Sequence, residues 1–333
     1  MIRRLWPWLR MLVGLAILVA LAWKVGAGAF LDGLRVIDAG TVLAALGLGL
    51  VTTVCSAWRW CLVARRMGLR LGLPGAVADY YRALLLNAVL PAGVLGDAHR
   101  AVSHGRRSGD VRRGVRAVVL ERLAGQVALV TVGVAVLLTR PDLLAALVSH
   151  LALPGRGLLV AAVGALAAAV GVAAWVRFGP GRARWRPALR TTLCDARVLL
   201  APAVLALSVT ALLGYLALFL VAARAAGADA PVTRLLPLLL LALLAMSLPV
   251  NIGGWGPREA ACALAFGAAG LDAAQGLTTA VVYGVLAMVA CLPGVAVLLL
   301  RRGAVRRREG GQVATERLDQ AGQQLPPLVG RGE

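Results

Sequence analysis

Long apolar runs recur along the chain and limit what it can fold into more than any other feature. They lie at residues 9–30, 40–64, 76–100, 115–139, 157–177, 201–223, 234–270 and 277–300. A helix of about 20 residues crosses a hydrocarbon core of about 30 Å, so most of these runs are long enough to span a membrane. The sequence therefore predicts an all-α, polytopic helical membrane protein and argues against a soluble enzyme or a disulfide scaffold.

Basic residues give the chain a formal net charge of +20, and almost all of them are arginines. They gather in short loops next to the apolar runs, which favours a role in membrane topology over binding to nucleic acid. The loops around residues 65–70, 100–116 and 177–197 and both terminal segments hold far more of them than the alternate loops. By the positive-inside rule we expect a multi-pass protein of the plasma (inner) membrane with cytoplasmic N- and C-termini.

Two runs are interrupted by residues that break helices. The run 76–100 has basic loops on both sides and contains Pro91 and Gly93, so we interpret it as a re-entrant hairpin from the cytoplasmic face. The run 234–270 has weakly charged flanks and is broken around Pro249, so it should enter from the opposite face. Six full spans and two oppositely oriented hairpins suggest an inverted-topology repeat with a site near the midplane. The alternative is that both breaks are ordinary loops, which would give eight or more spans.

The two ends of the chain are interpreted separately. The run 9–30 is predicted to be an uncleaved signal anchor, and a signal peptide cleaved near Ala27-Gly28-Ala29 is the alternative. Residues 1–302 are expected to form one flippase-like transmembrane domain. Residues 303–333 are polar and rich in arginine, glycine and glutamine, which predicts a disordered basic cytoplasmic tail.

Charged residues inside the apolar runs are the strongest candidates for a function. Each costs about 2.5–3.5 kcal/mol at the centre of a bilayer, so it needs a partner or a polar surrounding. The basic ones are Arg59, Arg82, Arg122 and Arg258, and the acidic ones are Asp79, Asp97, Glu121 and Glu259. Four residues of each sign permit near neutrality, which would suit a packed polar interior. We expect Glu121 to meet Arg100 or Arg258, and Arg122 to meet Asp97.

The second break has the composition of an anion site. Glycines there let backbone amides turn inward, and Pro257 suits the first position of a helix. Amides at that helix start, together with Arg258, could hold a phosphate or carboxylate, while Glu259 could cap the helix or bind a cationic head group. The alternative is a tight turn whose charges satisfy neighbouring helices.

The first break carries a related set of polar residues. Asp97 is either the N-cap of the following half-helix or, with Arg100, the border of the cytoplasmic mouth of a cavity. Tyr80 and Tyr81 are interpreted as interfacial aromatic residues with no chemical role. The predicted substrate-binding residues are Asn87, Asp97, Arg100, Glu121, Arg122, Asn251, Gly254, Gly256, Arg258 and Glu259.

Covalent chemistry has little support in the sequence. The three histidines lack zinc-binding spacing, the five cysteines form no C-x-x-C pair, and no Walker motif is present. We therefore expect no catalytic residue, no metal and no cofactor.

The motifs resemble a known family when taken together. Asn87, Pro91, Gly96, Asp97 and Arg100 are followed by Glu121-Arg122 and then by Pro249, Gly253, Gly254, Gly256, Arg258 and Glu259. This order is similar to the flippase-like transmembrane region of lysylphosphatidylglycerol synthases, although Trp255 and Pro257 depart from the usual turn. The resemblance implies a membrane domain that moves aminoacylated phosphatidylglycerol between leaflets. The soluble synthase domain would be missing, which makes this a stand-alone member.

These observations lead to one main hypothesis. The chain is expected to be a lipid translocase that binds an anionic or aminoacylated phospholipid head group in a polar cavity between re-entrant helices. Its expected partners are membrane lipids and a separate synthase or glycosyltransferase, with a homo-oligomer as a further option and no nucleic acid. The alternative is a membrane enzyme or accessory factor acting on polyprenyl-phosphate substrates.

Overall fold

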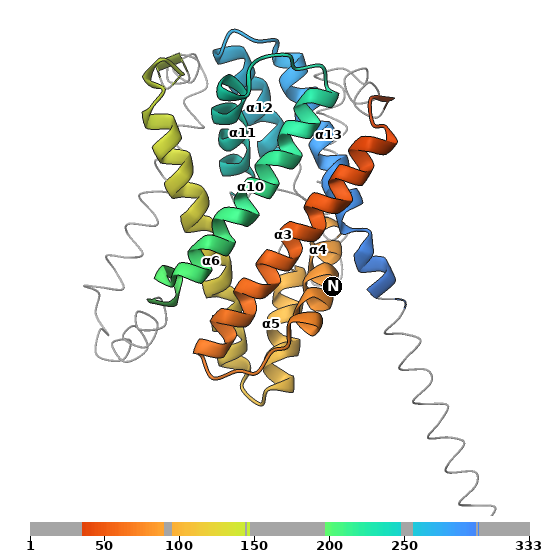
Figure 1. The fold of residues 1–333 in the computed structure, drawn as a ribbon, viewed down its shortest axis with the longest axis vertical. Helices are drawn as coiled ribbons and strands as arrows, with labels where there is room; N and C mark the ends of the chain where they lie inside the picture. Colours follow the sequence, from red (N-terminus) through yellow and green to blue (C-terminus); the bar gives the residue numbers. More distant parts are fainter. Residues whose placement is uncertain are drawn as a thin grey trace, which may run out of the picture.

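The computed structural model describes residues 35–89, 95–143, 145–146, 197–247, 256–297 and 299. Every regular element in these ranges is a helix, which confirms the predicted all-α fold (Figure 1). The longer helices are α3 (Ala39–Arg66), α4 (Leu73–Val89), α5 (Leu95–Arg107), α6 (Val111–Leu138), α10 (Pro202–Ala225), α11 (Val232–Met246), α12 (Pro257–Ala268) and α13 (Ala273–Cys291). The runs 9–30 and 157–177 and the tail 303–333 lie outside the described residues.

Four helices are long and apolar enough to cross a membrane. They are α3, α6, α10 and the segment Ala273–Val297, which contains α13. Their mean hydropathy over 18 residues lies between 1.6 and 2.5. They coincide with the predicted runs 40–64, 115–139, 201–223 and 277–300. The chain is therefore a multi-pass membrane protein.

Aspartates mark the starts of three of these long helices. The side chains of Asp38, Asp110 and Asp272 each accept a hydrogen bond from a backbone N–H in the first turn of α3, α6 and α13. Such caps satisfy amides that have no partner within the helix. Hydrogen bonds from Thr41 hold the pKa of the Asp38 carboxyl below its usual value. These caps fix where the helices begin in the sequence.

The two interrupted runs form helical hairpins at opposite ends of the bundle (Figure 1). Helix α4 packs against α5, and α11 packs against α12. Each hairpin leaves the bundle at the end where it entered, because α5 leads directly into α6 and α12 leads directly into α13. The arrangement agrees with the predicted pair of oppositely oriented hairpins. The breaks themselves, at residues 90–94 and 248–255, lie outside the described residues.

The helix order repeats after one half of the described bundle. Helix α3, hairpin α4–α5 and helix α6 are followed later by helix α10, hairpin α11–α12 and helix α13. Exchanging the two halves maps the packed pairs of these helices onto one another: α5 with α6 corresponds to α12 with α13, and α6 with α10 corresponds to α13 with α3. Because the hairpins lie at opposite ends, the repeat is inverted, as the sequence predicted.

Glycines allow several of these helices to touch through their backbones. A Cβ atom added to Gly96 of α5 would lie 2.1 Å from the carbonyl oxygen of Ala83 in α4. A Cβ added to Gly114 of α6 would lie 2.6 Å from the Cα of Gly105 in α5. Small residues at such contacts let membrane helices approach closely. The first hairpin is therefore held tightly against α6 near the turn that joins them.

Candidate functional site

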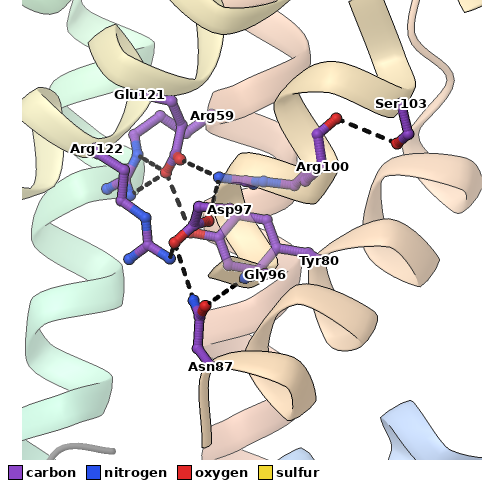
Figure 2. A network of polar contacts seen from close by, with 9 residues as sticks. All are labelled: Arg59, Tyr80, Asn87, Gly96, Asp97, Arg100, Ser103, Glu121 and Arg122. Atoms are coloured by element: carbon purple, nitrogen blue, oxygen red, sulfur yellow. Dashed lines mark hydrogen bonds and ion pairs between the residues drawn. The ribbon is translucent and has the colours of Figure 1, made fainter. Parts of the chain in front are cut away.

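Charged side chains from three helices meet inside the first half of the bundle (Figure 2). We call this group the ion cluster; it consists of Arg59 of α3, Asp97 and Arg100 of α5, and Glu121 and Arg122 of α6. Three polar residues also bond to its members: Tyr80 and Asn87 of α4, and Ser208 of α10, which accepts a hydrogen bond from Arg59 Nη1 at 3.1 Å. Five helices, α3, α4, α5, α6 and α10, therefore position the cluster.

Glu121 lies at the centre of the ion cluster and has no exposed surface. Its Oε1 accepts hydrogen bonds from Arg59 Nη2 at 2.6 Å, from Arg59 Nε at 3.1 Å and from the Tyr80 hydroxyl at 3.2 Å. Its Oε2 accepts one from Arg100 Nη2 at 2.9 Å. One carboxylate thus connects α3, α4, α5 and α6, and the predicted pairing of Glu121 with Arg100 is confirmed.

Asp97 is the second acidic member, and its environment corrects one prediction. Its carboxylate accepts hydrogen bonds from Asn87 Nδ2 at 3.0 Å, from Arg100 Nη2 at 3.0 Å and from Arg122 Nη2. The pairing with Arg122 is confirmed. The N-cap role is wrong, because α5 begins at Leu95 and Asp97 lies within its first turn. Asn87 bonds the helix start instead, accepting the Gly96 N–H at 2.7 Å.

The ion cluster lies well inside the long helices. Glu121 is ten residues after the start of α6, or about 15 Å along the helix axis. Arg59 is seven residues before the end of α3, or about 10 Å. In helices that cross a membrane, these positions fall below the head groups. Ionised groups at this depth are costly and mark functional sites.

Arg100 counts among the arginines of a predicted cytoplasmic loop, but it lies within α5 and is buried. It is 1% exposed, and its guanidinium carbon lies 4.2 Å from the ring centroid of Tyr80 and 4.5 Å from that of Trp60. The interpretation of Tyr80 and Tyr81 as interfacial residues is also wrong, because both are buried. Aromatic faces attract cations, so Tyr80 contacts the cluster through its ring as well as its hydroxyl.

The ion cluster carries more positive than negative charge. It holds three arginines and two carboxylates, which gives a formal charge of +1. The side chains of Arg59 and Arg100 are 6% and 1% exposed, whereas that of Arg122 is 42% exposed. The surplus charge is therefore accessible at Arg122.

The second hairpin brings together three predicted residues at the start of α12. The Gly256 N–H donates to Glu259 Oε2 at 2.6 Å, and Arg258 Nε donates to Glu259 Oε1 at 2.9 Å. The guanidinium of Arg258 also lies 5.3 Å from the ring centroid of Tyr283. Glu259 thus caps the start of α12, which is one of the two roles predicted for it. Asn251 and Gly254 lie outside the described residues.

Comparison with known protein families decides where the chain belongs. The family described as "Lysylphosphatidylglycerol synthase TM region" matches residues 8–303. The chain is a member of this family. Comparisons with curated proteins and with solved structures find no match. The resemblance drawn from the motifs is confirmed, and membership indicates a role connected with membrane lipids.

The matched region of this lysylphosphatidylglycerol synthase TM family includes the ion cluster and both hairpins. The structure brings together five of the predicted site residues: Asn87, Asp97, Arg100, Glu121 and Arg122 (Figure 2). Arg59 and Tyr80 are not among the predicted site residues, although Arg59 is one of the charges in the apolar runs. No group of three or more metal-ligating side chains occurs in the part of the chain that the structure describes.

Proposed function

We propose that this protein is a lipid translocase that binds an anionic or aminoacylated phospholipid head group at the ion cluster. Family membership supports a lipid substrate. The observation that carries the proposal is the accessible arginine Arg122, which belongs to a positively charged cluster at membrane depth. A phosphate forms strong, charge-assisted hydrogen bonds with a guanidinium group. The head group would contact Arg122 while the acyl chains stay in the lipid.

Movement between leaflets needs a route to both faces of the membrane. The inverted repeat places one hairpin at each end of the bundle, and the two halves pack in equivalent ways (Figure 1). Folds of this kind expose a central site alternately to either side. This symmetry supports transport over simple retention of a lipid.

Binding and movement are proposed in preference to covalent chemistry. A general base needs a carboxylate or imidazole that can accept a proton from the substrate. Within the described residues of the site, Asp97, Glu121 and Glu259 each accept hydrogen bonds from an arginine. We propose that no catalytic step takes place here, and that a separate synthase or glycosyltransferase supplies the lipid.

We also propose the plasma membrane as the location, with the basic end of the bundle in the cytoplasm. Arg65 and Arg66 end α3, and Arg106 and Arg107 end α5. These helix ends lie on the same side of the bundle, at the bottom of Figure 1. By the positive-inside rule we propose that this side faces the cytoplasm, and the spans predicted from the sequence would then put both termini there as well.

Cysteine labelling in cells tests this orientation. Single cysteines are introduced into a cysteine-free variant by Ser108→Cys, in the turn before α6, and by Asp229→Cys, in the turn before α11; both positions are exposed. A membrane-impermeant maleimide should label the Asp229→Cys variant in intact cells or spheroplasts. It should label the Ser108→Cys variant only after the membrane is opened. The reverse pattern would contradict the proposed orientation.

Leaflet exchange in liposomes tests the transport function. Purified protein is reconstituted with head-group-labelled phosphatidylglycerol, its lysyl ester or a polyprenyl phosphate. We expect exchange of a phospholipid, and we expect Arg122→Gln to slow it at least about tenfold, because a charge-assisted hydrogen bond to the phosphate is lost. The matched control is Arg113→Gln, on the same helix and also paired with an aspartate, but 55% exposed.

Two results would contradict this proposal. One is folded wild-type protein that exchanges none of the lipids. The other is exchange that Arg122→Gln leaves unchanged. Turnover of a polyprenyl-phosphate sugar by the purified protein would instead favour the enzyme alternative.

A further inference from the structure

We infer that the ion cluster selects a phosphodiester head group with a single negative charge and no cationic substituent, such as that of phosphatidylglycerol, and rejects aminoacylated lipids. The inference rests on the proposed function and narrows its substrate. Three observations carry it: the net positive charge of the cluster, the hydrogen bonds that its carboxylates already accept from arginines, and an accessible arginine with an N–H group that has no partner.

No acidic residue of the predicted apolar runs is left to balance the surplus charge of the cluster, because Asp79 is paired with Arg107 and Glu259 with Arg258. Asp97 and Glu121 already serve three arginines. The predicted spans 9–30 and 157–177 and the breaks 90–94 and 248–255 contain no aspartate or glutamate. An unbalanced charge in a medium of low polarity is strongly unfavourable. A ligand with one negative charge would neutralise the cluster.

An ammonium group, by contrast, finds no carboxylate left for it among the described residues of the site. Glu121 accepts four hydrogen bonds, and Asp97 accepts three. Glu259 accepts from Arg258 and from the Gly256 N–H. Displacing an arginine from any of them would leave one more buried cation. A lysyl ester brings two ammonium groups, so its head group should be repelled.

The donors that remain are those of Arg122. The Arg122 Nε is buried and has no hydrogen-bond partner. The Nε and Nη1 of Arg100 also have none, but they belong to a buried guanidinium packed against the rings of Tyr80 and Trp60, so they are not counted as donors for a ligand. Arg122 donates to Asp97 through Nη2, and 42% of its side chain is accessible. An accessible guanidinium with an unpaired N–H suits the oxygens of a phosphodiester. The site therefore offers donors and positive charge, which is the chemistry that a plain anionic head group requires.

Lipid binding to the purified full-length protein tests the selection independently of transport. Binding is measured by native mass spectrometry with phosphatidylglycerol, lysyl-phosphatidylglycerol and phosphatidylcholine, which adds a cationic group to the same phosphodiester. We expect phosphatidylglycerol to bind at least about tenfold more tightly than either of the others. Arg122→Gln should remove this preference, whereas Arg122→Lys, which keeps the charge, should retain most of it. Arg113→Gln should behave as the wild type.

The inference is overturned if lysyl-phosphatidylglycerol or phosphatidylcholine binds as tightly as phosphatidylglycerol. It is equally overturned if Arg122→Gln keeps the preference while the folded state, checked by gel filtration and thermal unfolding, is intact. Leaflet exchange measured on the same preparations separates this result from the proposed function. Selective binding without exchange would support the inference and contradict the translocase, and exchange without selectivity would do the opposite.

Discussion

Replacing Glu121 with alanine is expected to lower the free energy of unfolding by about 3–5 kcal/mol, which is typical when one partner of a buried ion pair is removed. Glu121 is fully buried and accepts hydrogen bonds from Arg59, Arg100 and Tyr80. Without it, two buried guanidinium groups lose their shared carboxylate. Thermal unfolding of the purified protein in detergent, followed by tryptophan fluorescence, should show a large drop in the melting temperature.

The matched control for this prediction is an exposed ion pair. Asp142 lies 3.5 Å from Arg140 and its side chain is 69% exposed, so water screens the interaction. Asp142→Ala should change the melting temperature far less than Glu121→Ala. Equal melting temperatures for the wild type and Glu121→Ala would show that the ion cluster does not hold its helices together.

The second large effect is expected at Gly96. A Cβ atom there would lie 2.1 Å from the Ala83 carbonyl oxygen and 2.8 Å from its carbonyl carbon and Cα. These are backbone atoms, so α4 and α5 would have to separate. Gly96→Ala should therefore destabilise the protein by about 3 kcal/mol, at the upper end of typical overpacking. Limited proteolysis and thermal unfolding both measure the loss.

Gly47 provides the control for Gly96. It lies in the exposed face of α3, and a Cβ added there meets nothing within 4 Å. Because alanine is the better helix former, Gly47→Ala should raise the stability by up to about 1 kcal/mol. If both substitutions had the same effect, close packing of the hairpin would not be the reason for the glycine at position 96.

Much of the fold could be predicted because local features of the sequence decide it. The length of an apolar run sets the span of a helix, and prolines and glycines mark its break. The distribution of arginines between loops indicated that the run 76–100 returns to the face where it entered. The inverted repeat followed from two such breaks with opposite flanks. None of these steps needs knowledge of how the helices are rotated about their axes.

The site was predicted less completely because it depends on that rotation. Arg100 follows a helix break and precedes a basic loop, so its neighbours in sequence are those of a surface residue. In the structure its side chain lies between the rings of Trp60 and Tyr80, on two other helices. For Arg59 the sequence did show a charge in an apolar run that needs a partner. It did not show which partner, because Glu121 is 62 positions away in the sequence. Contacts between helices distant in sequence decided both outcomes.

The backbone contact between Gly105 and Gly114 has a mechanical consequence. It joins α5 to α6 close to their connecting turn, whereas the pair of Asp97 and Arg122 lies about 12 Å further along α5. The glycine contact could therefore act as a hinge for the first hairpin, while the ion pair holds α5 against α6 at a distance from that hinge. A phosphate that draws Arg122 away from Asp97 would remove a contact between α5 and α6 far from the hinge, where a small rotation of the hairpin gives a large displacement.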